Sequence, residues 1–134
     1  HTVFASRDTL VGQYVGSSAI NTVNAIERAQ DGVLFIDEVY SLINSGDSNS
    51  SGENYCAEVI NTLVAAMTNP RYHFCVVIAG YRSRMSEFFN MNEGLPSRFD
   101  MRNVINIDDY KPEVLEKILK SKKQKKIDNK KSPG

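Results

Sequence analysis

One short apolar run, residues 33–36, constrains the fold of this chain more than any other feature. The run reads Val-Leu-Phe-Ile and includes two β-branched side chains. A continuous apolar run of this length is typical of a strand with both faces covered, as in the parallel sheet of an α/β protein. Asp37 and Glu38 follow it directly. Because ligands of open α/β sheets bind beyond the carboxyl ends of the strands, we expect these two carboxylates to face a site.

Apolar patterns along the rest of the chain predict strands and helices in alternation. The expected strands are residues 2–6, 33–36, 74–79 and 104–107, and the expected helices are residues 17–30, 53–68, 82–90 and 112–123. Residues 7–17, with two glycines, are expected to form a loop with exposed apolar side chains, and residues 94–100 to be irregular. This alternation predicts a parallel α/β sheet with helices on both of its faces.

Charge is distributed unevenly, although the formal net charge is +0. Residues 1–116 hold 8 lysines and arginines against 15 acidic residues, whereas residues 117–134 hold 8 lysines against one aspartate. An acidic body opposes phosphate binding, so we expect no nucleic-acid partner and interpret the basic tail as a solvated helix end. No apolar run approaches the ~18 residues of a membrane span, so we expect no membrane association. A cytoplasmic or plastid-stromal location is the default expectation.

A hydrophobic strand that ends in Asp-Glu is the Walker B arrangement of P-loop NTPases. In that arrangement one carboxylate holds Mg²⁺ through its water shell, and its neighbour orients or deprotonates the water that attacks the γ-phosphate of ATP. We assign the metal role to Asp37 and the water to Glu38. The alternative for the bare pattern is an ordinary buried strand followed by a polar turn.

Five blocks of the sequence, in this order, resemble the AAA+ ATPases of the CbbX/CfxQ type, which include red-type Rubisco activases. The blocks are Leu10–Gly16, Gly32–Leu42, Val76–Tyr81, Asn92–Phe99 and Asp109-Tyr110. The resemblance covers about residues 2 to 120. It implies a P-loop NTPase fold, ATP and Mg²⁺ as cofactors, a homo-oligomeric ring that is hexameric in the intact protein, and a polypeptide as the substrate that the ring remodels.

The resemblance also implies two further roles at the nucleotide. Arg98, in the block Pro-Ser-Arg-Phe, falls on the arginine finger that reaches the ATP of the neighbouring subunit. A guanidinium is always charged and can bridge γ-phosphate oxygens, which suits that role. The alternative is that Arg98 pairs with an acidic group such as Asp100. Tyr81 stands at the sensor 1 position, where most AAA+ proteins carry a polar residue such as Asn, so it is expected to contact the cofactor.

The segment Tyr14-Val15-Gly16 falls on the pore loop of the family, which lines the central channel. An aromatic ring offers sequence-tolerant contact to a threaded polypeptide, and the glycine leaves the loop free to move. The alternative is that Tyr14 packs on its own domain. Residues 44–54, rich in Ser, Gly and Asn, occupy the place of a second pore loop.

The sequence departs from the family in lacking the Walker A pattern Gly-x-x-x-x-Gly-Lys-Ser/Thr. In the family this loop and the first strand lie upstream of the position of Thr2. That strand sits between the segments equivalent to residues 74–79 and 104–107. We therefore expect residues 1–107 to form a partial AAA+ core, and residues 108–134 to form the start of the lid helix with a basic tail. The chain is then either part of an ATP-hydrolysing module or a non-catalytic remnant that cannot bind ATP alone.

Overall fold

The computed structural model describes residues 1–43 and 52–131, with side chains described from residue 55 in the second range. The chain divides into two units, His1–Met101 and Arg102–Gly134, which are described separately. Most of the predicted second pore loop, residues 44–51, lies outside the described residues.

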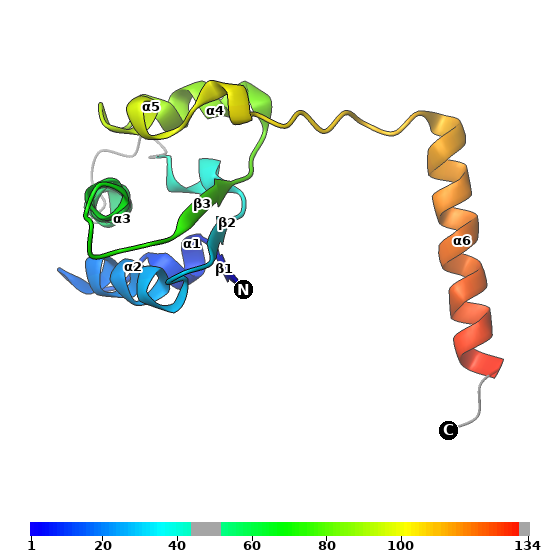
Figure 1. The fold of residues 1–134 in the computed structure, drawn as a ribbon. Helices are drawn as coiled ribbons and strands as arrows, with labels where there is room; N and C mark the ends of the chain where they lie inside the picture. Colours follow the sequence, from blue (N-terminus) through cyan, green and yellow to red (C-terminus); the bar gives the residue numbers. More distant parts are fainter. Residues whose placement is uncertain (44–51, 132–134) are drawn as a thin grey trace. The chain divides into compact units, whose positions relative to one another are not determined.

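The first unit is built on a parallel sheet of three strands, β1 (Thr2–Ala5), β2 (Val33–Ile36) and β3 (Cys75–Ile78), in that spatial order. Thr2 pairs with Val33, which in turn pairs with Cys75, so the strands are in register from their first residues. The helices that connect these strands run beside the sheet (Figure 1). This arrangement confirms the parallel α/β fold predicted from the alternation of patterns.

The remaining elements agree with most of the predicted boundaries. They are α1 (Arg7–Leu10), α2 (Ser17–Arg28), the 3₁₀ helix η1 (Val39–Leu42), α3 (Gly52–Met67), α4 (Arg82–Phe89), α5 (Leu95–Arg98), the 3₁₀ helix η2 (Met101–Asn103) and α6 (Pro112–Lys131). Two irregular segments were predicted wrongly, because residues 7–10 and 95–98 each form one helical turn. Leu10, expected to be exposed, is buried, since α1 turns it toward the core.

The core lies on one face of the sheet. Val3 and Ala5 of β1 and Leu34 and Ile36 of β2 point to this face and are buried with apolar side chains of α2 and α3. Figure 1 shows α2 and α3 on this side of the strands. Burial of these apolar groups is the main favourable term in folding, at about 25 cal/mol per Å².

The opposite face of the sheet does not carry helices among the described residues of the first unit, contrary to the prediction. Phe4 is 73% exposed and has the Phe35 ring as its neighbour, with ring centroids 5.6 Å apart. A continuous apolar run shows that both faces of a strand are suited to burial, but it does not specify which segments bury them.

Residues 104–107 do not form the predicted strand. Ile105 is 86% exposed and Ile107 is 89% exposed. A strand needs a hydrogen-bonded neighbour, and the described residues pair none with this segment. In contrast, α6 continues to Lys131, beyond the predicted end near residue 123, because Lys and Gln favour helix. Within the described residues, none of the helices is long and apolar enough to span a membrane.

Candidate functional site

The two carboxylates predicted from the sequence lie at the turn that follows β2. The N–H of Asp37 donates to the carbonyl oxygen of Ala5 at 3.1 Å, which continues the pairing of β2 with β1. Asp37 Oδ1 accepts the N–H of Glu38 at 2.9 Å. Both side chains are exposed, so the strand ends where two carboxylates meet solvent at the carboxyl edge of the sheet.

Glu38 has a left-handed backbone, with φ at 50° and ψ at 46°. This conformation costs a residue with a Cβ about 1–2 kcal/mol. Such conformations persist where surrounding contacts enforce them, and they are concentrated at active sites. Here the Ser41 N–H donates to the Glu38 carbonyl oxygen at 2.8 Å, and the Val39 N–H donates to that of Ala79 at 2.9 Å. The turn is therefore fixed to η1 on one side and to the end of β3 on the other.

An aromatic pair lies beside this turn. The rings of Tyr40 in η1 and Tyr81 after β3 are stacked, with centroids 5.0 Å apart and planes inclined by 27°. The guanidinium carbon of Arg84 lies 5.6 Å from the centre of the Tyr40 ring. Desolvation, then the negative charge of Glu38 and the neighbouring Tyr81 phenol, raise the pKa of Tyr40 above its ordinary value. The Tyr40 phenol is therefore protonated at neutral pH.

Sequence reasoning did not identify Tyr40 or Arg84 as parts of this site. The signal available was Gly80, which precedes Tyr81. A Cβ on Gly80 would lie 3.4 Å from Cδ1 of Tyr40 and 3.1 Å from the sulfur of Met85. A side chain at position 80 would press on η1 and α4, so the glycine allows both to approach the end of β3 closely.

The residues present fit a magnesium ion that is held mainly by phosphates and water. Among the described residues, no group of three or more His, Cys, Asp or Glu side chains could hold a metal ion. Mg²⁺ in nucleotide sites commonly uses one or two carboxylates and keeps several waters. Asp37 offers an exposed carboxylate with one oxygen engaged by Glu38, which suits contact through a metal-bound water.

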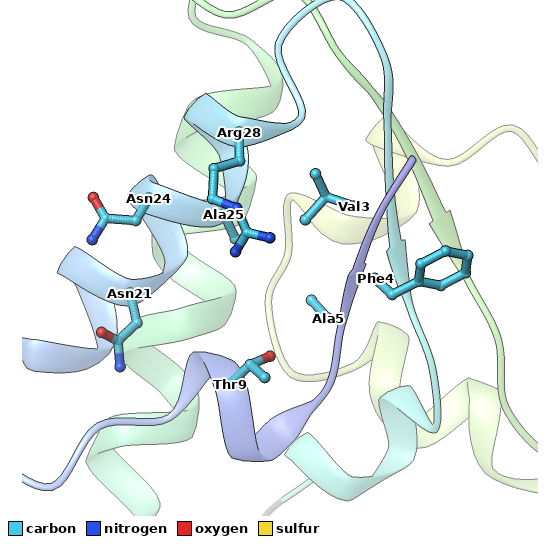
Figure 2. Close-up of a pocket in the computed structure, with 8 residues that line it drawn as sticks. All are labelled: Val3, Phe4, Ala5, Thr9, Asn21, Asn24, Ala25 and Arg28. Atoms are coloured by element: carbon cyan, nitrogen blue, oxygen red, sulfur yellow. The ribbon is translucent and has the colours of Figure 1, made fainter. Parts of the chain in front are cut away.

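A separate pocket of about 320 Å³ lies between α2 and β1 (Figure 2). Its lining includes Thr9 and the α2 side chains Asn21, Asn24 and Arg28, but not Asp37 or Glu38. Figure 2 shows Val3 directed toward α2 and Phe4 directed to the other side of β1. This pocket is thus distinct from the carboxylate turn.

Arg98 is the last residue of α5, and its guanidinium contacts the C-terminal end of α3. Its Nε donates to the carbonyl oxygen of Val64 at 2.9 Å, and one Nη donates to that of Gly94 at 3.0 Å. The other Nη lies 3.5 Å from the hydroxyl of Thr68. These partners lie in α3, directly after it and in the segment before α5, so the structure does not bring Arg98 together with Asp37 and Glu38.

The predicted pore-loop residues lie immediately before α2. Tyr14 is 74% exposed and Val15 is 93% exposed. Gly16 is the N-cap of α2, with φ at 82°. The Ser17 hydroxyl accepts the Tyr14 N–H at 3.0 Å and donates to the Tyr14 carbonyl oxygen at 2.6 Å. The backbone of the triplet is thus anchored, while its two large side chains face solvent.

Comparison with known proteins gives one family match and several curated relatives. Residues 1–107 match the family described as ATPase family associated with various cellular activities (AAA). A protein CfxQ homolog of Guillardia theta is 38% identical over 130 residues, or 95% of this chain and 42% of the relative. The chloroplastic ribulose bisphosphate carboxylase/oxygenase activase of Cyanidioschyzon merolae is 40% identical over 86% of this chain and 37% of the relative.

A third relative is named as a secretion system protein. The ESX-1 secretion system protein EccA1 of Mycobacterium tuberculosis is 42% identical over 87% of this chain, but over only 20% of its own length. The chain therefore spans about two fifths of the first two relatives and one fifth of the third.

Proposed function

Because the chain belongs to the ATPase family associated with various cellular activities (AAA), we propose that it is the part of an ATP-hydrolysing module that carries the Walker B carboxylates. The observation that carries this proposal is the placement of Asp37 and Glu38. Both are exposed at the carboxyl end of a central parallel strand, and Glu38 is held in a left-handed conformation. The relation of the chain to the CfxQ homologs supports the CbbX/CfxQ-type assignment within the family.

In this proposal the two carboxylates have separate roles. Asp37 binds the water shell of a magnesium ion, which when bound neutralises charge on the β- and γ-phosphates. Glu38 accepts a proton from the attacking water as the water oxygen bonds to the γ-phosphorus. The bond from that phosphorus to the bridging oxygen breaks, which releases ADP and phosphate. General-base assistance of this kind contributes about 10²–10⁴ to a rate.

The phosphate-binding loop is not part of this sequence, which has no Gly-x-x-x-x-Gly-Lys-Ser/Thr pattern. The chain covers 42% of the Guillardia theta relative. We place the loop in a segment that precedes His1 in the full-length protein, and we expect the 134-residue chain alone to bind ATP negligibly. The second candidate function is a non-catalytic AAA+ remnant or interaction module.

Assembly and substrate belong to the same proposal. The full-length protein forms a homo-oligomeric ring, a hexamer, in which Arg98 serves the ATP of a neighbouring subunit. Tyr14, Val15 and Gly16 contact a polypeptide in the channel, and Tyr81 contacts the nucleotide. The exposure of Tyr14 and Val15 supports the channel contact. A location in the cytoplasm or plastid stroma remains a prediction, and one relative is named as chloroplastic.

The test is the Glu38→Gln variant of the full-length protein, with kcat and nucleotide affinity measured separately. We expect kcat to fall by about 10²–10⁴ while the affinity for ATP with Mg²⁺ is retained. Glu27→Gln is the matched control, because Glu27 is an exposed glutamate on α2 whose nearest basic partner, Arg71, is 3.9 Å away. Equal loss of binding and hydrolysis would contradict the role of Glu38. Absence of hydrolysis by the unsubstituted protein would favour the non-catalytic candidate.

A further inference from the structure

The turn that carries Glu38 and the end of β3 are joined through Tyr40. We propose that Tyr40 is a positioning residue for ATP hydrolysis, which holds Glu38 in its left-handed conformation by stacking on Tyr81. This inference rests on the proposed function, because it assigns a role in the reaction of Glu38. Neither the match to the family nor the sequence pattern assigned a role to Tyr40.

The backbone of Glu38 is strained. With φ at 50°, this residue would leave its conformation for a right-handed or extended one if its neighbours allowed it. The side chain of Glu38 is exposed, so packing of that side chain does not hold it. The constraint must therefore come from the backbone on either side and from the residues that follow in η1.

Two contacts connect η1 to the end of β3. The Val39 N–H donates to the Ala79 carbonyl oxygen at 2.9 Å. Beside this bond, the rings of Tyr40, one residue after Val39, and of Tyr81, two residues after Ala79, stack 5.0 Å apart. A single backbone hydrogen bond leaves rotation about its axis free. A second contact beside it, made by two planar rings, restricts that rotation. Tyr40 therefore fixes the direction in which the turn leaves β2.

The Tyr40 ring has a further neighbour in α4. Arg84 of α4 lies over it, with Cζ 5.6 Å from the ring centre, and its terminal nitrogen lies 3.6 Å from the Glu87 carboxylate. A cation over an aromatic ring is attracted by the electron-rich face of that ring. Tyr40 is thus held between the end of β3 and α4, and its ring has little freedom to leave the stack.

The consequence is a separation of catalytic rate from nucleotide affinity. Removal of the Tyr40 ring frees Glu38 to relax, so that its carboxylate spends less time where it can accept the proton of water. Asp37 and Tyr81, which contact the magnesium ion and the nucleotide in the proposed function, keep backbone contacts of their own without the ring. The Asp37 N–H donates to the Ala5 carbonyl oxygen, and the Tyr81 carbonyl oxygen accepts the Arg84 N–H. Loss of the ring is therefore expected to lower kcat and to leave KM close to its original value.

The experiment compares Tyr40→Ala and Tyr40→Phe in the full-length protein. We expect Tyr40→Ala to lower kcat about tenfold or more, which corresponds to loss of about 1.4 kcal/mol of transition-state stabilisation. The KM for ATP should stay within about twofold, since only the transition state is affected. Tyr40→Phe keeps the stacked ring and should restore kcat to within about threefold. Equal kcat values for Tyr40→Ala and the unsubstituted protein would overturn the inference.

Tyr72 supplies a matched control. It is another tyrosine with an arginine over its ring, since Cζ of Arg71 lies 5.6 Å from the ring centre, but it lies in the turn before β3. Tyr72→Ala should leave kcat within about twofold, because its ring does not contact the turn after β2. A loss in Tyr72→Ala as large as that in Tyr40→Ala would show a general structural effect and would overturn the inference.

A double substitution separates positioning from a merely structural role. If Tyr40 acts through Glu38, then Tyr40→Ala adds no loss of single-turnover rate to Glu38→Gln, whereas independent effects would multiply. Multiplied losses would overturn the inference. Should Tyr40→Ala fail to fold, Tyr40→Leu fills the space without an aromatic ring and is expected to show the same fall in kcat. An active protein that loses activity in Glu38→Gln but not in the Tyr40 variants would refute this inference alone. A protein insensitive to Glu38→Gln would refute the proposed function.

Discussion

The Nε of Arg98 donates a hydrogen bond to the carbonyl oxygen of Val64, 2.9 Å away. Val64 lies in the last turn of α3, where backbone carbonyls have no partner within the helix. A cation at a helix C-terminus is also stabilised by the helix dipole. Arg98 therefore caps α3 in the chain alone. As an arginine finger it would have to give up these bonds or extend other guanidinium atoms toward a neighbouring subunit.

The first prediction concerns this cap. Arg98→Ala should lower the free energy of unfolding by about 2 kcal/mol, because it leaves the carbonyl oxygens of Val64 and Gly94 without their charged donor. Denaturant unfolding of the full-length protein measures the change. Arg71→Ala is the control, since Arg71 is 74% exposed and 3.9 Å from Glu27, and its loss should cost less than about 0.5 kcal/mol.

ATP hydrolysis by mixed assemblies tests the proposed role of Arg98 as an arginine finger. In a ring doped with Arg98→Ala subunits, a subunit with an intact Glu38 should lose activity when its neighbour lacks Arg98. Other NTPases lose about 10³–10⁵ in rate without such a finger. Activity that falls only in proportion to the fraction of substituted subunits would contradict contact between subunits. An unchanged unfolding free energy for Arg98→Ala would contradict the cap.

The second prediction concerns the backbone of Glu38. Glu38→Gly should be more stable to unfolding than Glu38→Ala by about 1 kcal/mol, because only glycine adopts the left-handed conformation without steric cost. Both variants should be inactive, since both lack the carboxylate. Thermal or urea unfolding of the two variants, side by side, gives the difference directly.

Asp31 is a second residue other than glycine with a left-handed backbone. Its φ is 59°, and it lies in the turn between α2 and β2, away from the carboxylate turn. Asp31→Gly should likewise exceed Asp31→Ala in stability, but both variants should retain hydrolysis. If alanine and glycine were equally stable at position 38, the left-handed conformation would not be strained in solution.

The sequence predicted the parts of the fold that depend on local pattern. The apolar run at residues 33–36 predicted β2 with its observed bounds. The helical spacing of apolar side chains in residues 53–68 predicted α3 to within one residue at each end. The strand at residues 104–107 was predicted wrongly because a strand depends on a partner strand from elsewhere in the chain, and local composition carries no information about that partner.

The site could be predicted only in part for a similar reason. Residue type and position predicted that Asp37 and Glu38 follow a strand and face solvent, and both are exposed after β2. Backbone strain at Glu38 and the stack of Tyr40 on Tyr81 arise from the way η1 meets β3, which no pattern within either segment specifies.

The third prediction concerns the exposed triplet before α2. Tyr14→Ala should leave basal ATP hydrolysis within about twofold, because the ring lies outside the described core and is 74% exposed. Stimulation of hydrolysis by an unfolded polypeptide, with denatured casein as the probe, should be lost, since the ring supplies the apolar contact. Tyr110→Ala is a control at another exposed tyrosine and should keep the stimulation. Stimulation that survives in Tyr14→Ala would contradict the pore-loop role.

The fourth prediction concerns residues 104–107, whose apolar side chains Val104, Ile105 and Ile107 are exposed. Backbone amides that are not hydrogen-bonded exchange with solvent quickly, whereas those within a sheet exchange slowly. If the full-length protein supplies a strand between β3 and this segment, as the family resemblance implies, amide exchange at residues 104–107 should be slow there and fast in the 134-residue chain. Amides of β2, already paired on both sides, are the internal reference and should be protected in both. Fast exchange of residues 104–107 in the full-length protein would show that this segment stays unpaired, and the edge of β3 would then need a different neighbour.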